Sequence, residues 1–428
     1  MVVNTMNKIE FKTYREVLEL LDTHNSHLLL GNGFNRGLGV NTSYEAIFGR
    51  MTENDYGIYK EMKGVVAQCG HDLEKFIGML EKDINVNNTF LKKYVANKVK
   101  YDFMKATYEI VKNEIKNIYA EKNEGVFILF QKFTNYFTLN YDPLLYLLLL
   151  NFKLKDSDIE CKAIAMQPSL KFIEKDMNEA QNNIYSKIKR AREVGTVNIN
   201  AGENSVATSK SMGKMNRKHF VSAIELYSKG QNKGWKPTGI EKVIKKILEE
   251  EKKNQVLSVV NDGSKQMTFE GMTEFVFNVN LETQNLFFLH GAFHIYRDGK
   301  MEKKITQTSD KALYDRIEEI LNNEDRDIVC VFQSENKIDE INKSEYLKNA
   351  LAKLLTLSGS MVIIGSALSD NDKHIFDNIN KSKIDTIYIA SKESNMKNDY
   401  NRASEIFTNK KVILFDRDTI SYGSQNNV

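Results

Sequence analysis

Three side chains that could take part in chemistry follow apolar segments at widely separated points of the chain. Asn140 and Asp142 follow the segment 135–139, and His290 follows the segment 286–289. An amide such as Asn140 can bind hydroxyl groups and align a water molecule, and a neutral imidazole such as His290 can accept a proton. A histidine at a strand end can also be purely structural, and Asp142 can either bind a ligand or hold the turn.

Two stretches of glycine and small polar residues also follow apolar segments, GNGFNRG at 31–37 and GSALSDND from residue 365. Glycine lets backbone N–H groups approach a phosphate without interference from a Cβ atom, and Ser366 and Ser369 can hydrogen-bond a ribose or a phosphate. The spacing G-x-G-x-x-x-G differs from the dinucleotide fingerprint, and we find no strand ending in an acidic residue about 20 residues later. An ordinary tight turn at 31–37 is the alternative, and Asp370 or Asp372 can simply cap the next helix.

The elements that must position these residues are short apolar segments alternating with helical patterns. Segments of strand character lie at 27–30, 135–139, 273–281, 286–289, 327–332, 361–364, 386–390 and 412–415. Helical periodicity occurs at 14–21, 72–83, 91–122, 123–133, 144–152, 344–357 and 372–379. This alternation predicts an α/β fold with a Rossmann-like parallel sheet flanked by helices. Ligands bind beyond the carboxyl ends of such strands, so the polar tips can meet around one small molecule.

The helices at 72–83 and 91–122 are expected to pack on the sheet, since their apolar residues recur at spacings of three and four. His71 and Glu74 lie at the start of the first of them. An exposed histidine and a first-turn glutamate favoured by the helix dipole account for both without a catalytic role.

The chain divides into two parts of one predicted core, 1–152 and 273–428, separated by a large inserted region at 153–272. Within it, Gln181 to Ile240 holds eleven Lys and Arg residues against three Asp and Glu residues. A solvated lysine-rich face is the ordinary explanation, and an acidic partner such as nucleic acid is the alternative. The stretch Thr196 to Met215 has the composition of a loop or a hairpin.

The composition is that of a globular chain of 428 residues with 41% hydrophobic content and a net charge of +3. The small charge gives no reason to expect nucleic acid or membrane as the main partner. The three cysteines form no C-x-x-C pair, and the longest apolar run, at 144–150, is far shorter than the roughly 20 residues of a membrane helix. We find no secretory signal, and these features together predict a cytoplasmic protein.

Four motifs in order resemble the motif set of sirtuin-like NAD-binding domains: GNG at 31–33, TLNYD at 138–142, LHG at 289–291 and GS at 365–366. The longer strings LHGAFHIY, SEYLKNALAKLL and VIIGSALSDNDKHI resemble a bacterial branch of that group whose function is unknown. Sirtuin deacylases carry a four-cysteine zinc module, which this sequence lacks. The chain is similar instead to zinc-free sirtuin-like effectors of bacterial antiphage systems, which hydrolyse NAD to nicotinamide and ADP-ribose.

The resemblance implies that NAD is the substrate, that no metal is needed, and that Asn140 and His290 are the catalytic pair. It also implies that the nucleotide is bound by Gly31, Asn32, Gly33, Phe34, Asn35, Thr138, Asp142, Gly365, Ser366 and Ser369. Breaking the bond between nicotinamide and ribose passes through an oxocarbenium-like state, so the site must hold the sugar and activate water on the opposite face. Asn140 would bind the ribose hydroxyls and align the water, and His290 would accept its proton. His294 lies four residues after His290, but no third ligand with plausible spacing completes a metal site.

An NAD hydrolase of a defence system must be restrained until infection. We therefore expect control by a homo-oligomeric arrangement, by the inserted region, or by a protein partner or phage-derived activator. Two rival functions remain open at this point. One is a non-catalytic sensor of NAD or an ADP-ribose-type nucleotide, and the other is a nucleic-acid-binding protein that works through the basic insertion.

Overall fold

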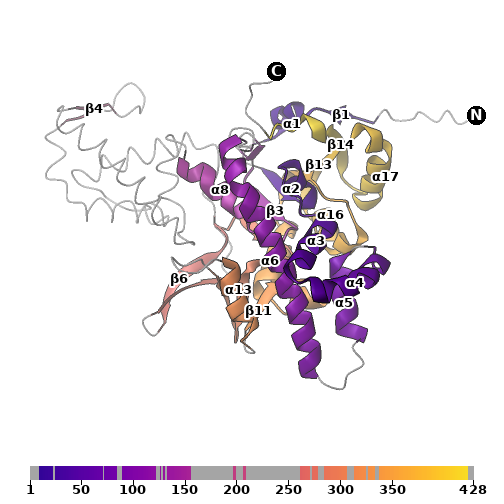
Figure 1. Ribbon diagram of the computed structural model, residues 1–428. Helices are drawn as coiled ribbons and strands as arrows, with labels where there is room; N and C mark the ends of the chain where they lie inside the picture. Colours follow the sequence, from indigo (N-terminus) through magenta and orange to yellow (C-terminus); the bar gives the residue numbers. More distant parts are fainter. Residues whose placement is uncertain are drawn as a thin grey trace, which may run out of the picture.

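The computed structural model describes residues 9–22, 25–70, 72–83, 89–121, 126, 129–130, 133–155, 196–198, 206–208, 261–269, 272–277, 284–305, 313–323, 326–332 and 337–422 (Figure 1). Within these residues, the strands form a seven-stranded sheet, a five-stranded sheet and a two-stranded hairpin.

The seven-stranded sheet is parallel throughout and confirms the predicted α/β fold with a Rossmann-like sheet. Its order is β1-β14-β13-β12-β2-β3-β8. The strands are β1 (Phe11–Lys12), β2 (Ser26–Leu30), β3 (Asn135–Thr138), β8 (Leu286–Phe288), β12 (Ser358–Ile364), β13 (Lys383–Ser391) and β14 (Lys411–Asp416). From β2 the chain proceeds outward to β3 and β8, whereas from β12 it proceeds outward on the other side to β13 and β14. The strand order therefore reverses between β2 and β12, the kind of position where such sheets bind ligands.

The second sheet is antiparallel, with the order β11-β9-β10-β7-β6. Its strands are β6 (Ser264–Phe269), β7 (Met272–Phe277), β9 (Gly291–Asp298), β10 (Met301–Lys304) and β11 (Arg326–Cys330). The expectation that the apolar segments 273–281 and 327–332 complete the parallel sheet is therefore wrong. An apolar run indicates a buried strand, but it carries no information on the direction of the strand beside it.

Other expectations concern the insertion and its borders. β4 (Thr196–Asn198) and β5 (Val206–Thr208) pair as a hairpin, in agreement with one of the two structures expected for 196–215. β6 lies inside the segment 153–272, yet it pairs with β7 of the second sheet. Most of the basic stretch 181–240 and most of the helix expected at 123–133 lie outside the described residues, and the domain boundaries stay a prediction.

Twelve helices of the described residues surround the sheets. They are α1 (Tyr14–Leu20), α2 (Asn32–Gly37), α3 (Tyr44–Asn54), α4 (Tyr56–Gln68), α5 (Leu73–Asp83), α6 (Thr89–Glu121), α8 (Leu144–Lys155), α13 (Leu313–Leu321), α14 (Lys337–Asn342), α15 (Glu345–Leu355), α16 (Lys373–Lys381) and α17 (Met396–Ile406). The short 3-10 turns among the described residues are η4 (Asp370–Asp372), η5 (Glu393–Asn395) and η6 (Arg417–Thr419). Several helices begin at a side-chain cap: Thr13 forms a capping box with Glu16, and Ser43 and Ser344 cap α3 and α15.

The core lies on both faces of the parallel sheet because successive side chains of each strand point to opposite faces. Leu28 and Leu30 of β2 belong to one apolar cluster, with residues of α1 and α8, whereas Leu29 belongs to another, with residues of α15 and α16. A third cluster joins α3, α4, α5 and part of α6 to strands β9 and β11. The helix predicted at 72–83 thus packs among helices and against the second sheet instead of on the parallel sheet.

Figure 1 shows the long helix α6 running from the level of α8 past α3 towards α13 and β11. Its residues contribute to two of the three clusters, with Phe103 in the cluster of the second sheet and Val111 in a cluster of the parallel sheet. The helix therefore ties the two sheets together beside the region where they meet. None of the helices in the described ranges is long and apolar enough to cross a membrane.

Candidate functional site

Two glycine-containing loops contact each other where the strand order reverses. Gly31 donates its N–H to the Ile364 carbonyl and Gly33 donates to the Gly365 carbonyl, each at 2.9 Å. A Cβ atom at Gly31 would lie 2.6 Å from the Gly365 oxygen, and one at Gly365 would lie 2.2 Å from the Phe34 nitrogen. Gly365 also has a φ of +75°, which favours glycine. The glycines are therefore required by the contact between the loops, and the two N–H groups expected to approach a phosphate are used within the protein.

The stretch 31–37 is also not the simple turn that its glycines suggest. Residues Asn32–Gly37 form helix α2, with Gly31 at the N-cap position. Glycine and asparagine have low helix propensity, but contact with the Gly365 loop fixes the first turn and overrides that preference. The helix then ends as Leu38 donates its N–H to the carbonyls of Phe34 and Asn35.

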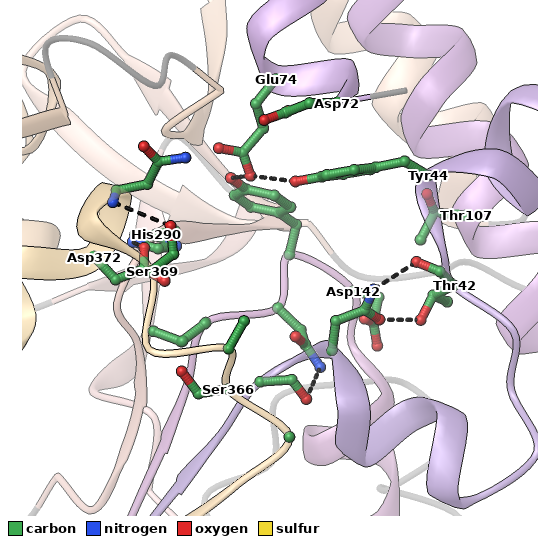
Figure 2. A pocket seen from close by; sticks show the side chains of 18 of the residues that line it. Thr42, Tyr44, Asp72, Glu74, Thr107, Asp142, His290, Ser366, Ser369 and Asp372 are labelled. Atoms are coloured by element: carbon green, nitrogen blue, oxygen red, sulfur yellow. Dashed lines mark hydrogen bonds and ion pairs between the residues drawn. The ribbon is translucent and has the colours of Figure 1, made fainter. Parts of the chain in front are cut away.

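A pocket with a volume of about 320 Å³ opens at the carboxyl ends of the central strands (Figure 2). In Figure 2, His290, Ser369 and Asp372 lie on one side, Thr42 and Asp142 on the other, and Ser366 below. Eight of the residues expected from the sequence line this pocket: Gly31, Asn32, Asn140, Asp142, His290, Gly365, Ser366 and Ser369. Segments that are far apart in the sequence are thus brought together as expected.

Four of the expected residues lie outside this pocket. Phe34 is buried in the core, where its ring packs against Phe130 and Tyr422. Thr138 is buried, and its hydroxyl accepts the Asn140 N–H at 3.0 Å. Gly33 lines an adjoining cavity, described below, and Asn35 lies behind the pocket wall.

A chain of three side chains orients the Asn140 amide. Asp142 is buried, and its carboxylate accepts the Leu144 N–H at 2.9 Å and the Asn35 amide N–H at 2.9 Å. Because Asn35 turns its nitrogen to Asp142, its oxygen accepts the Nδ2 of Asn140 at 3.0 Å. The Nδ2 of Asn140 also lies 3.4 Å from the Gly31 carbonyl, which leaves the Oδ1 of Asn140 as the acceptor for a ligand.

These contacts support the turn-holding role considered for Asp142, and because Asp142 also lines the pocket, its ligand-binding role stays a prediction. Both carboxylate oxygens accept hydrogen bonds from the protein, one at the start of α8 and one at Asn35, so Asp142 holds the turn and the amide chain. Burial raises the pKa of Asp142, and the hydrogen bonds from Leu144 and Asn35 oppose that effect by favouring the carboxylate.

Ser366 and Ser369 hold the second loop. The Ser366 hydroxyl accepts the Leu368 N–H and that of Ser369 accepts the Asn371 N–H, each at 3.2 Å. Both serines keep their O–H as a donor for a ligand. Leu368, between them, has a φ of +50°, and the Arg402 guanidinium donates to its carbonyl at 3.1 Å. A strained residue held in place beside a pocket is common at functional sites.

His290 lies where the parallel sheet passes into the antiparallel sheet. The chain leaves β8 at Phe288, turns through Leu289 and His290, and enters β9 at Gly291. Gly291 has a φ of +82°, and a Cβ atom there would lie 1.8 Å from the Val329 oxygen. The His290 carbonyl accepts the Val331 N–H at 2.9 Å. This turn presents the imidazole to the pocket instead of continuing as a strand.

The His290 imidazole is 3% exposed, and its Nε2 has no hydrogen-bond partner among the described residues. Burial lowers the pKa of His290 well below its usual value, and the charge of Lys337 lowers it further, whereas a hydrogen bond with the Leu139 backbone acts in the opposite direction. The Nε2 lies 3.4 Å from an Asp372 oxygen, but this contact is an ion pair only when the ring is protonated. The lowered pKa makes His290 a neutral side chain with a buried acceptor facing the pocket.

A polar cluster at one end of the pocket contains Glu74, for which the sequence suggested no catalytic role, and Lys337, which the sequence analysis missed. Glu74 is only 7% exposed, and its Oε1 accepts the hydroxyls of Tyr44 at 2.8 Å and Tyr141 at 2.7 Å. Lys337 lies 3.3 Å from the other Glu74 oxygen and 3.3 Å from Asp372. Glu74 lies in the first turn of α5, as expected, and it is in addition buried and lines the pocket. Its partner Lys337 comes five residues after the apolar segment 327–332, but it stands in an ordinary charged stretch that carries no motif.

A larger cavity of about 800 Å³ adjoins the first one. The two share Asn32, Gly365, Ser366 and Ala367. The second cavity extends along the ends of β13 and β14, where its wall includes the basic side chains of Arg36, Lys392 and Arg417 and the acidic ones of Asp399 and Asp418. Together the two cavities lie along the carboxyl edge of the sheet from β14 to β3.

Metal binding was considered for His290 and His294. His294 packs against Tyr146 and Phe288, with ring centroids 5.9 Å and 5.0 Å away, and it does not line the pocket. Across the described ranges, no group of three His, Cys, Asp or Glu side chains is arranged to hold a metal ion. Cys69 and Cys330 are free thiols. A metal-free site stays a prediction.

Comparison with known proteins adds one match. A family model described as a domain of unknown function, DUF4917, matches residues 242–421. The match includes His290, Lys337 and Gly365 but not Asn140 or the first glycine loop. A search of curated proteins finds no match.

Proposed function

We propose that this protein binds NAD at the reversal of strand order and hydrolyses it to nicotinamide and ADP-ribose. The observation that carries the proposal is the buried Nε2 of His290, which lacks a hydrogen-bond partner among the described residues, in the pocket that Asn140 also lines. A buried acceptor without a partner is costly, so a ligand hydroxyl or a water at this position would be stabilising.

The proposed chemistry needs a group that holds the ribose and a base that takes a proton. The Oδ1 of Asn140 can accept a hydrogen bond from a ribose hydroxyl or from the attacking water. The neutral His290 imidazole can accept the proton that the water loses as the C–O bond to the anomeric carbon forms. Nicotinamide leaves with the electron pair of the broken C–N bond, which neutralises its ring, so the leaving group needs no added proton.

The dimensions of the site favour a dinucleotide over a smaller ligand. The first cavity, with Asn140 and His290, would hold the nicotinamide ribose. The adjoining cavity shares Gly365 and Ser366 with it and would take the rest of the nucleotide. Arg36, Lys392 and Arg417 supply positive charge in that second cavity, where phosphate oxygens can accept hydrogen bonds from arginine and lysine.

A role in antiphage defence by depletion of NAD is the further part of this proposal, and it rests on the resemblance to sirtuin-like effectors alone. It requires that activity be restrained before infection by an oligomeric arrangement, by the segment 153–272, or by a partner or phage-derived activator.

The test is nicotinamide release from NAD by the purified full chain, with and without extracts of phage-infected cells. Asn140→Ala and His290→Ala should each abolish release. Asn54→Ala is a matched control, because that exposed amide lies on α3 and bonds Glu109, and neither residue lines the pocket. Release by the wild type that survives both pocket substitutions would contradict the assigned site.

A non-catalytic sensor is the other reading of the same pocket. It would be favoured if calorimetry detects binding of NAD or ADP-ribose, weakened by Asn140→Ala, while no nicotinamide appears under any condition. If neither binding nor release is observed, the ligand has been assigned wrongly. The nucleic-acid alternative depends on residues 181–240 and stays a prediction that salt-dependent retention on DNA or RNA would test.

A further inference from the structure

Lys337 is a buried lysine held between two carboxylates from different parts of the chain. It begins α14 and is 6% exposed, and its Nζ lies 3.3 Å from Glu74 of α5 and 3.3 Å from Asp372 of η4. Burying an ammonium group is expensive unless it is paired in good geometry. Burial acts to lower the pKa of Lys337, but the charges of Glu74 and Asp372 outweigh it and the pKa is raised, so the side chain is a fixed positive charge.

The Asp372 oxygen that contacts Lys337 also faces the catalytic histidine proposed above. Its Oδ1 lies 3.3 Å from the Lys337 Nζ and 3.4 Å from the His290 Nε2. A carboxylate at this distance, acting alone, would favour a protonated imidazole. Protonated His290 could not accept a proton from water. Lys337 supplies the opposing charge next to the same oxygen.

Of the other groups around His290, His374 also acts to lower the pKa of His290, but by less than Lys337 does. His374 of α16 has its ring centroid 5.6 Å away, and burial lowers its pKa to about 4, so it is neutral near pH 7. Tyr141, which follows β3, has its centroid 6.1 Å away, and burial raises its pKa well above the usual value, so it is neutral as well. Among the described residues, Glu74 contacts Lys337 and accepts hydrogen bonds from the hydroxyls of Tyr44 and Tyr141, and it makes no contact with His290.

We propose that Lys337 is a positioning residue that keeps His290 a neutral proton acceptor by holding and neutralising Asp372, with Glu74 as the fixed anchor of the lysine. The chain of contacts runs Glu74, Lys337, Asp372, His290 through four separate elements of the fold. Lys337 itself does not need to touch the substrate. The catalytic significance of this arrangement rests on the proposed function, whereas the charge state of His290 can be measured in the protein without any substrate.

The first experiment is an NMR titration of the histidine side chains in the full chain, with the His290 signals assigned from His290→Gln. In Lys337→Met the methylene stem is kept and the charge is lost. We expect the His290 titration midpoint to move to higher pH than in the wild type, because Asp372 is then uncompensated. In Lys337→Arg, which keeps the charge, the midpoint should stay near that of the wild type.

Two further variants serve as controls, one for the loss of any nearby lysine and one for a failure of Lys337→Met to fold. Lys343→Met removes an exposed lysine just after the same helix, one that bonds Glu340, and it should leave the midpoint unchanged. If Lys337→Met fails to fold because Glu74 and Asp372 repel each other, the double variant Glu74→Gln/Lys337→Met removes the anchor charge as well and should show the same upward movement. A midpoint that stays at the wild-type value in a folded variant lacking the lysine charge would overturn the inference.

The second experiment separates this inference from the proposed function. In Lys337→Met the acid limb of the pH profile for nicotinamide release should move to higher pH, so that the loss of activity is larger at pH 6 than at pH 8. A uniform loss at both pH values would indicate a structural role only and would contradict the inference. If the NMR midpoint moves but no release is ever seen, the electrostatic role of Lys337 stands and the hydrolase proposal fails.

Discussion

At the scale of single residues, the candidate site depends on hydrogen-bond donors and acceptors with a fixed direction. The Asp142 carboxylate can only accept, so it fixes the Asn35 amide, and Asn35 in turn fixes the Asn140 amide with its oxygen free for a ligand. In such a network, reversing the donor and acceptor ends of one side chain forces its neighbours to reverse as well.

Asp142→Asn should reverse this chain of amides. The new side chain must still accept the Leu144 N–H, so it presents a nitrogen to Asn35, and the Asn35 and Asn140 amides must turn over. We expect nicotinamide release to fall by about one to two orders of magnitude, as for a displaced general acid–base arrangement. Steady-state kinetics with a thermal unfolding curve tests this, with exposed Asp385→Asn as the control. Unchanged kinetics in Asp142→Asn would show that the amide direction is unimportant.

If His290 is the proton acceptor, as proposed, its pKa determines how the activity of the wild type depends on pH. Because burial lowers the pKa of His290 well below the usual range, its active neutral form is present throughout neutral pH and is lost only in acid. We expect kcat for nicotinamide release to be level from pH 6.5 to 8 and to fall below that range. If instead kcat falls with a midpoint near pH 7, His290 titrates near its usual pKa or is not the base.

At the scale of elements, the site depends on two loops that contact each other through glycine. Gly31 and Gly33 follow β2, Gly365 follows β12, and their backbones approach closely at the place where the strand order reverses. The loops carry Asn32, Ser366 and Ser369 into the pocket. Glycine here is a packing requirement, and the residues around it are the ones that can contact a ligand.

Gly365→Ala should therefore be more damaging than an equivalent substitution elsewhere. At Gly365 a Cβ meets the Phe34 nitrogen at 2.2 Å, whereas at Gly299, which also has a positive φ, no atom lies within 4 Å. We expect Gly299→Ala to cost about 1 kcal/mol of unfolding free energy from backbone strain alone and Gly365→Ala to cost clearly more, about 3 kcal/mol or above. Urea denaturation of both variants measures the difference, and equal costs would contradict the importance of the loop contact.

At the scale of the whole molecule, four histidines that are buried or partly buried link stability to pH. Burial lowers the pKa of His27 to about 4, of His294 to about 3 and of His374 to about 4, and it lowers that of His290 as well. The unfolded chain binds protons at these positions near the usual value of 6.5, while the folded chain does not. Protonation in acid therefore favours unfolding.

The free energy of unfolding should consequently be fully retained above pH 6.5 and fall as the pH is lowered from 6.5 to about 4. Each buried neutral histidine contributes a slope of up to about 1.4 kcal/mol per pH unit. Denaturation curves at fixed pH values test this, and His294→Gln should lower the slope because it removes one of these groups without changing a residue that lines the pocket. A stability that is independent of pH below 6.5 would contradict the burial of these rings.

The sequence by itself determined six of the seven strands of the parallel sheet, all except β1, and the polar residues at the ends of several of them. Apolar runs at 27–30, 135–139, 286–289 and 361–364 became β2, β3, β8 and β12, because a strand buried on both faces must be apolar throughout. Since the carboxyl ends of parallel strands lie on one edge, Asn140, His290 and Ser366 could be expected to meet around one pocket.

Three features could be seen only in the tertiary structure: the second sheet, the loop contact that requires the glycines, and the polar cluster beside His290. An apolar run does not encode the direction of its partner, so β7 and β11 could not be assigned to an antiparallel sheet from sequence. Glu74 and Lys337 lie on helices 263 positions apart in the chain. Glu74 could be recognised only as a first-turn glutamate, and no local pattern connects it with Lys337. The charge contacts that we propose act on His290, beside the effect of its burial, arise only when α5, α14 and η4 are brought together by folding.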